Sequence, residues 1–251
     1  MKVTYIGHSG FLVETKIANL LFDYFEGELP QLDVDFPLFV FASHAHHDHF
    51  NPDVLALANQ YKNVTYVLSN DIKITDEMKD KYQLSSVFVE KQIIFVAPAI
   101  RRIIPVVMGD GEENHITMET IKSTDEGVAF LLRVCDRRIF HAGDLNCWVW
   151  EEDTVNQVNH MKTQYKRLIE KINGREIFLA MAPLDPRQGK YYKLSMDYLL
   201  NATMIHYAVP MHMWGQYEYI DRYMEERKTK DLPTQILKFS EPLTCMELCT
   251  E

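Results

Sequence analysis

The chain has 251 residues, of which 47% are hydrophobic and 25% are charged. These values are typical of a globular protein with one large domain or two small ones, and the longest apolar stretches are far below the roughly 18 residues that a membrane span requires. A formal net charge of −10 argues against binding to nucleic acid, because such binding needs a basic surface that displaces counterions from phosphates. We therefore expect a soluble protein that acts on a small molecule.

The first residues, MKVTYIGHSGF, contain one lysine and lack the apolar block and the small-residue cleavage site of a secretory signal. This predicts a cytoplasmic location. Four cysteines are too few and too scattered for a disulfide framework, so we expect reduced thiols at Cys135, Cys147, Cys245 and Cys249.

Short strands are predicted along the first half of the chain, where β-branched and aromatic residues form brief apolar runs. The run over 37–43 is typical of a buried strand, and Asn51-Pro52-Asp53 after it is typical of a helix start. Residues 72–127 are β-rich and hard to divide. Further strands are expected at 3–6, 11–15, 19–25 and 64–68, with a hairpin over 128–134 and 138–143.

The second half alternates strands with helices. A helix is predicted to begin at an N-terminal cap formed by Asp153-Thr154 and to end at Asn173-Gly174, because apolar residues recur every three or four positions between them. No flexible linker separates the halves, so residues 1–251 are predicted to form a single domain, with sheet packed on sheet and helices outside. The other expected elements are a strand over 176–184, a helix over 195–207, a strand over 207–213, a helix over 216–228 and a strand over 234–240.

A cluster of histidines follows the buried strand that ends at Ser43. Its sequence is H-x-H-x-D-H, formed by His44, His46, Asp48 and His49, with His47 between them. Imidazole nitrogens and a carboxylate suit Zn²⁺, Mn²⁺ or Fe²⁺. The alternative is a chance run on a solvated loop, but ten histidines in 251 residues would rarely place four within six positions.

This motif resembles the signature of the metallo-β-lactamase superfamily. The resemblance implies an α/β (α+β) fold, the four-layer αββα metallo-β-lactamase sandwich. It also implies roles for residues at the ends of predicted strands: Asp23 would orient a ligand histidine, Asp144 would bridge two metals, and His212 would be the last ligand. Turn or core roles are the alternative for each of these three residues.

One ligand expected from the resemblance is missing, because no histidine occupies the usual position between the cluster and Asp144. The segment aligned there offers Thr124, Asp125 or Glu126, and the nearest histidine is His115. We favour Asp125 over His115, and a carboxylate there would favour a harder metal such as Mn²⁺ or Fe²⁺. A further option is that only the second site, formed by Asp48, His49, Asp144 and His212, binds metal firmly.

The resemblance implies a metal-dependent hydrolase with two divalent ions, Zn or Mn, with Fe as a further option. A metal-bound hydroxide would attack a small, anionic ester, lactone or phosphodiester, and Asp48, His49 and Asp144 would be catalytic, with Asp48 handling a proton. The segments GHSGF, HAGD and PMH resemble the branch that includes ascorbate-6-phosphate lactonase. The flavo-diiron branch has glutamate where this chain has His46, which disfavours dioxygen reduction.

Substrate contacts must come from other loops. Arg187 could bind a phosphate or a carboxylate with two hydrogen bonds. The alternative is that it lies on a solvated loop and has no part in substrate binding. Trp214 is a candidate for the pocket wall, together with Trp148 and Trp150, although core packing explains tryptophans equally well.

Two other functions stay open on the sequence alone. A metal-dependent RNase shares the chemistry but conflicts with the acidic charge. A metal-binding sensor without catalysis would explain the missing histidine. Neither the substrate, the native metal nor a homo-oligomeric state follows from the sequence.

Overall fold

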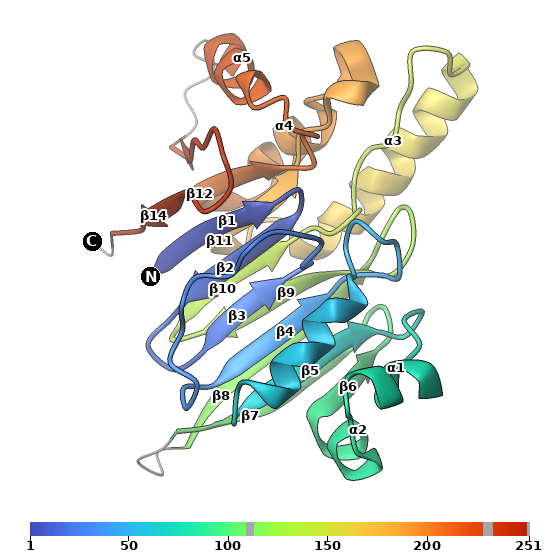
Figure 1. The fold of residues 1–251 in the computed structure, drawn as a ribbon. Helices are drawn as coiled ribbons and strands as arrows, with labels where there is room; N and C mark the ends of the chain where they lie inside the picture. Colours follow the sequence, from blue (N-terminus) through green and yellow to red (C-terminus); the bar gives the residue numbers. More distant parts are fainter. Residues whose placement is uncertain (109–112, 228–232, 250–251) are drawn as a thin grey trace.

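The computed structural model describes residues 1–108, 113–227 and 233–249, and it shows two mixed β-sheets packed face to face (Figure 1). Each sheet has seven strands among these residues. Sheet A runs in the order β14 (Cys245–Glu247), β1 (Lys2–Gly7), β2 (Gly10–Glu14), β3 (Asn19–Phe22), β4 (Leu38–Ala42), β5 (Val64–Ser69) and β6 (Ile93–Val96). Sheet B runs in the order β13 (Gln235–Ile236), β12 (Met204–Met211), β11 (Glu176–Pro183), β10 (Arg137–His141), β9 (Val128–Val134), β8 (Glu113–Lys122) and β7 (Arg101–Val107).

Helices cover the outer face of each sheet, so the molecule has four layers (Figure 1). The predicted αββα sandwich is therefore confirmed. Sheet A is covered by η1 (Pro52–Asn59), α1 (Asp76–Lys81) and α2 (Ser86–Gln92), and sheet B by α3 (Val155–Ile169), α4 (Leu194–Ala202) and α5 (Glu218–Arg227). Short 3-10 turns, η2 (Glu170–Ile172) and η3 (Pro186–Tyr191), follow α3 and β11.

The alternation of side chains along β4 explains why two apolar layers form. Phe39 and Phe41 point into the core between the sheets, whereas Leu38 and Val40 point into a second cluster under η1, α1 and α2. The aromatic ring of Phe41 lies 5.3 Å from that of Phe130 in sheet B. A strand buried on both faces must be apolar throughout, which is why the run over 37–43 was recognisable.

The direction of the central strands fixes the position of the functional residues. Strands β3, β4 and β5 are parallel in sheet A, and β10, β11 and β12 are parallel in sheet B. The carboxyl ends of parallel strands meet at one edge of a sheet. Polar residues that follow these strands, such as Asp23, Asp144 and His212, are thereby brought to the same edge.

Several predicted elements differ from the structure. The region 72–127 contains two helices, α1 and α2, capped by Thr75 and Ser85. The helix predicted over 195–207 is wrong in its second half, because residues from Met204 onward pair with β11 as strand β12. Only two residues of the strand predicted over 234–240 form β13. The helix predicted over 216–228 corresponds to α5, and Lys228 lies outside the described residues.

Two further expectations concern the cysteines and the membrane. All four cysteines are free thiols, and only Cys147 is buried. Among the described residues, no helix combines the length and the apolar character needed to cross a membrane.

Candidate metal centre

Two groups of histidine and aspartate side chains lie at the edge where the parallel strands end. Within each group, the nitrogen and oxygen atoms that could bind a metal lie within 4.8 Å of one another. The first cluster is formed by His44, His46, Asp125 and Asp144, and the second cluster by His8, Asp48, His49 and His212. The structure thus brings together all seven residues that the sequence favoured as metal ligands, and it adds His8. The alternatives His115, Thr124 and Glu126 belong to neither cluster.

The motif folds so that its side chains separate into two directions. After β4, the carbonyl oxygen of His46 accepts hydrogen bonds from the backbone N–H groups of His49 and Phe50, which makes a tight turn. His44 and His49 are buried by this turn. The side chain of His47 is 83% exposed and belongs to neither cluster.

Asp144 lies between the two clusters. Its Oδ2 atom is 3.6 Å from Nε2 of His44, in the first cluster. Its Oδ1 atom is 3.1 Å from Nε2 of His49 and 3.4 Å from Nε2 of His212, in the second cluster. The two oxygens of one carboxylate therefore face different clusters, which is the arrangement that a bridging ligand requires.

The remaining residues of the second cluster surround Asp48. Oδ2 of Asp48 is 3.3 Å from Nε2 of His8 and 3.9 Å from Nε2 of both His49 and His212. His8 is not among the metal ligands predicted from the sequence. The segment GHSGF was noted only as a family feature, although a histidine next to a glycine at a strand end was an available signal.

The first cluster depends on a close contact between two loops. Asp125 lies in the β8–β9 loop, with Oδ2 3.8 Å from Nδ1 of His46. Gly127 in the same loop has φ +66°, and a Cβ atom there would lie 1.9 Å from the carbonyl oxygen of Ser43. Only glycine allows this approach. His115, by contrast, is an exposed residue of β8, paired with Pro105, and it lies outside both clusters.

Asp23 orients one histidine of each cluster. Its Oδ2 atom lies 2.7 Å from Nδ1 of His49 and also accepts a hydrogen bond from the hydroxyl of Ser43, at 2.6 Å. The hydroxyl of Ser43 in turn lies 2.9 Å from Nδ1 of His44. Both rings therefore direct Nε2 toward the metal-binding atoms. This is the position that the resemblance implied for Asp23.

Asp185, which is not among the residues predicted from the sequence, holds His212 in the same way. Its Oδ2 atom lies 2.9 Å from Nδ1 of His212. Arg187 grips the same carboxylate, with Nε 3.0 Å from each oxygen and Nη2 2.5 Å from Oδ2. Arg187 had been considered only as a substrate contact. In the structure, part of its guanidinium group already supports His212 through Asp185.

Aromatic rings surround the second cluster. The indole N–H of Trp148 donates to the carbonyl oxygen of Asp144, at 3.1 Å, and the Trp148 ring lies 5.5 Å from that of His212. Trp214 covers His8 at 4.4 Å between ring centroids, and its ring also contacts the guanidinium group of Arg187 at 4.7 Å. These tryptophans therefore line the centre and do not lie in the core between the sheets.

The pKa values of the histidines and carboxylates in the centre depend on burial and on each other's charge. Burial alone would lower the pKa of His49, but the carboxylates of Asp144 and Asp23 outweigh it and raise the pKa to about 10. Burial, together with the charge of His49, lowers the pKa of His44 to about 4. Burial also raises the pKa of Asp125, with help from the nearby Asp144 charge. The ionisation states of the histidines and carboxylates in the centre therefore depend on one another.

The buried atoms of the centre fit a divalent cation. Four of them have no hydrogen-bond partner among the described residues: Nε2 of His8, Nε2 of His49, Nε2 of His212 and Oδ1 of Asp144. Leaving such atoms unsatisfied costs roughly 1–3 kcal/mol each. Nε2 of His49 and Nε2 of His212 lie 3.1 and 3.4 Å from Oδ1 of Asp144, and Nε2 of His8 lies 3.3 Å from Oδ2 of Asp48. Imidazole nitrogens and carboxylate oxygens are the donors that Zn²⁺ and Mn²⁺ accept.

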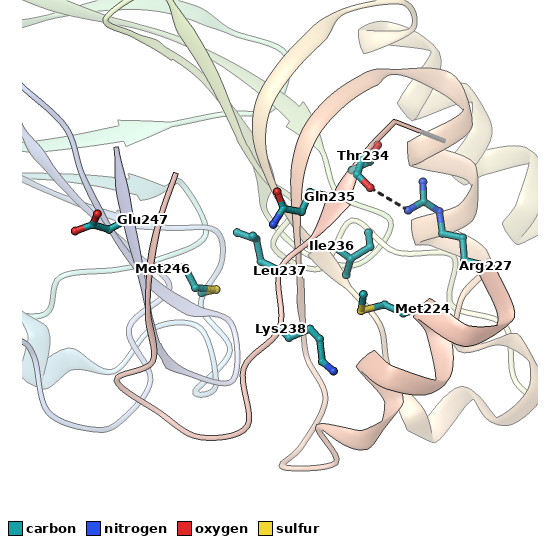
Figure 2. Close-up of a pocket in the computed structure, with 9 residues that line it drawn as sticks. All are labelled: Met224, Arg227, Thr234, Gln235, Ile236, Leu237, Lys238, Met246 and Glu247. Atoms are coloured by element: carbon teal, nitrogen blue, oxygen red, sulfur yellow. Dashed lines mark hydrogen bonds between the residues drawn. The ribbon is translucent and has the colours of Figure 1, made fainter. Parts of the chain in front are cut away.

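The cavity drawn in Figure 2 lies elsewhere in the molecule. It has a volume of about 690 Å³ and is bordered by α5, β13 and β14, with Arg227 donating to the carbonyl oxygen of Thr234 beside it. None of its lining residues belongs to either cluster. The candidate chemistry is therefore at the edge of the sandwich and not in this cavity.

Curated relatives match parts of the chain. A metal-dependent hydrolase of Salinibacter ruber is 38% identical over 86 residues, which cover 33% of this chain and 36% of the relative. Another metal-dependent hydrolase, from Opitutus terrae, is 48% identical over 62 residues, which cover 23% of this chain and 27% of the relative. The chain therefore aligns with about a third of these relatives' length.

Solved structures match the fold over almost the whole chain. A metallo hydrolase from the archaeon Ignicoccus hospitalis has a TM-score of 0.55 at 18% identity and covers 99% of both chains. A diiron β-hydroxylase from Streptomyces venezuelae has a TM-score of 0.60 at 9% identity, covering 98% of this chain and 54% of that one. At such low identity these similarities establish the fold alone.

The family follows from the sequence itself. Residues 2–160, well over half of the chain, match the family model described as the beta-lactamase superfamily domain. This span includes the strand β4, the histidine motif and Asp144. The chain therefore belongs to the metallo-β-lactamase superfamily.

Proposed function

We propose that this protein is a metal-dependent hydrolase that binds two divalent cations and acts on a small, anionic ester, lactone or phosphodiester. The observation that carries the proposal is the position of Asp144, whose two oxygens face two separate groups of histidine and aspartate ligands. The names of the curated relatives agree with this activity. The resemblance to the ascorbate-6-phosphate lactonase branch adds the lactone to the proposed substrate classes.

Seven residues are proposed to hold the two cations. Divalent cations bound here would lower the pKa of a water molecule toward neutrality and stabilise the negative charge that develops on a carbonyl or phosphoryl oxygen. His44, His46 and Asp125 would serve the first site, Asp48, His49 and His212 the second, and Asp144 both. Zn²⁺ or Mn²⁺ suits these donors, and the carboxylate of Asp125 shifts the first site toward the harder Mn²⁺ or Fe²⁺.

The second oxygen of Asp48 is suited to proton transfer. Oδ2 faces the second cluster, whereas Oδ1 lies on the side of the exposed His47, 3.9 Å from its Nδ1. The side chain is 12% exposed, so Oδ1 is near solvent. We assign to Oδ1 the acceptance of a proton from the attacking water and its delivery to the leaving group. His49 and Asp144 fix the position of the reacting groups.

Arg187 and Trp214 are proposed to select the substrate. The Arg187 side chain is 43% exposed, and its contacts with Asp185 use Nε and Nη2. Nη1 is therefore available to a phosphate or carboxylate group of a substrate. Trp214 is exposed beside it and offers an apolar surface next to the second cluster.

The hydrolase is favoured over a sensor without catalysis. The sensor hypothesis rested on the missing histidine of the first site. Asp125 lies among the first-cluster ligands, which supports a complete site with a carboxylate in that position.

Metal content and hydrolysis test the proposal together. Protein loaded with Mn²⁺ or Zn²⁺ and freed of excess should retain about two metals per chain by elemental mass spectrometry, and it should hydrolyse at least one compound in a panel of lactones, esters and phosphodiesters. Asp144→Asn should lose both properties, whereas the neighbouring control His47→Asn should keep them. Loaded protein that hydrolyses nothing in the panel, or wild type that retains no metal, would contradict the proposal.

A further inference from the structure

His8 is carried to the second cluster by a tight turn between β1 and β2. Its φ of 50° is in the left-handed region, and a Cβ atom at Gly10 would lie 2.9 Å from the carbonyl oxygen of Gly7. The carbonyl oxygen of His8 accepts a hydrogen bond from the backbone N–H of His212, at 3.3 Å. The turn in sheet A is thereby fastened to the end of β12 in sheet B. This contact places the two imidazole rings 4.2 Å apart.

The His8 side chain is buried, and its Nε2 atom has no hydrogen bond. The side chain is 5% exposed and packs against the rings of both His212 and Trp214. Nε2 lies 3.3 Å from Oδ2 of Asp48, yet the orientation is not that of a hydrogen bond, and no other partner exists among the described residues. Buried polar atoms in folded proteins nearly always have a partner, so this unsatisfied nitrogen needs an explanation, and a bound cation supplies one.

We propose that Nε2 of His8 is a direct ligand of the cation in the second cluster, together with Asp48, His49, His212 and Asp144. This inference rests on the proposed function, since it assumes that a cation binds there. Ligand atoms bound about 2.1 Å from one ion lie roughly 3–4 Å from one another. The distances of 3.3, 3.9 and 3.9 Å from Oδ2 of Asp48 to the three Nε2 atoms fit this spacing.

A third imidazole makes the two sites chemically unequal. The second cluster then offers three nitrogen atoms, whereas the first offers two nitrogens, from His44 and His46, and is completed by carboxylates. Nitrogen-rich sites prefer Zn²⁺ or Co²⁺, and oxygen-rich sites prefer Mn²⁺. His8 thus gives the second cluster the stronger preference for the softer ions.

Cobalt titration of variants tests the role of His8. Co²⁺ would be added to metal-free protein while its visible absorption and its binding isotherm are recorded. His8→Asn suits the test because asparagine tolerates a left-handed φ, and His47→Asn is the matched control from the neighbouring loop. Wild type and control should bind about two Co²⁺ ions. His8→Asn should weaken the binding of one Co²⁺ ion by at least about 100-fold and change the visible spectrum of that ion. Such a loss is at the upper limit of, or beyond, the effect of removing a residue that only supports a ligand.

The outcomes separate the two proposals. If His8→Asn binds both ions with unchanged affinity and spectrum, the His8 proposal is overturned and the hydrolase proposal stands. If wild type binds no Co²⁺, both are overturned. A nitrogen NMR spectrum of Zn²⁺-loaded wild type gives an answer even where the variant fails to fold. A metal-bound shift for Nε2 of His8 supports the proposal, and a free or protonated nitrogen overturns it.

Discussion

The first and second clusters are built to different degrees of rigidity. In the second cluster, His49 and His212 are buried and each is held by a buried carboxylate, Asp23 or Asp185. In the first cluster, the side chains of His46 and Asp125 are 44% and 42% exposed and lie on loops. Ligands held rigidly by outer partners bind metal more tightly. We therefore expect the second cluster, held at the strand ends, to bind metal more tightly than the first cluster, which depends on loops.

The largest effect is expected from Asp23, because it supports both clusters. Its carboxylate accepts hydrogen bonds from the backbone N–H and the hydroxyl of Ser43, at 2.7 and 2.6 Å, and it contacts His49. Asp23→Asn replaces one carboxylate oxygen, which accepts hydrogen bonds, with an amide NH₂ group. This group would face the N–H and O–H donors of Ser43. We expect the free energy of unfolding to fall by about 3–5 kcal/mol in urea denaturation, with loss of both metals.

Asp136→Asn is the matched control for this substitution. Asp23 has a left-handed φ of 40° and Asp136 one of 62°, but Asp136 is exposed and forms its ion pair with Arg133 on the surface. Its loss should change the free energy of unfolding by less than about 1 kcal/mol. Equal stability of the two variants would show that Asp23 does not hold the centre together.

Gly127 tests the contact on which the first cluster depends. Gly127→Ala should lower the free energy of unfolding by about 2–4 kcal/mol, because it combines a left-handed φ with a clash against the carbonyl oxygen of Ser43. Gly174→Ala shares a positive φ, of +69°, but no described atom lies within 4 Å of its Cβ position, so it should lose only about 1 kcal/mol. Thermal denaturation with and without metal compares them, and similar losses would refute the close contact.

Asp185 tests the rigidity of the second cluster alone. Asp185→Asn weakens the hydrogen bond to Nδ1 of His212 and the ion pair with Arg187. We expect the affinity of the second cluster for Co²⁺ or Zn²⁺ to fall about 10–100-fold in calorimetric titration. The affinity of the first cluster should not change. A loss in both clusters would mean that they are not separate sites.

The smallest effect is expected at the exposed end of the first cluster. Asp125→Asn should weaken Mn²⁺ binding there by about 10-fold, because a charged oxygen ligand becomes a neutral one. His115→Asn should have no effect, since His115 lies on the exposed face of β8. Competition with a chelator measures both affinities. A larger loss of Mn²⁺ affinity in His115→Asn than in Asp125→Asn would identify His115 as the ligand instead.

The parts of the centre that the sequence predicted follow from simple strand geometry. The histidine motif, Asp23, Asp144 and His212 all follow apolar strands whose carboxyl ends meet at one edge. The four-layer fold followed from the resemblance carried by these residues. That residues 1–251 form a single domain and that the protein lies in the cytoplasm stay predictions, and the oligomeric state stays open.

The residues that were missed depend on contacts between distant segments. His8 reaches the second cluster only because its turn is tied to His212, far along the chain. Asp185 was overlooked beside the more conspicuous charge of Arg187. Helices α1 and α2 have no buried residue, so they lack the apolar periodicity by which helices are recognised.

The position of bound metal is the most direct test of a centre in which Asp144 joins two clusters. Crystals of Zn²⁺- or Mn²⁺-loaded protein would be measured at the absorption edge of the metal, and the anomalous difference map would be calculated. We expect two peaks, one among the first-cluster ligands and one among the second-cluster ligands, with one oxygen of Asp144 bound to each. A single peak, or a peak away from Asp144, would contradict the dinuclear centre.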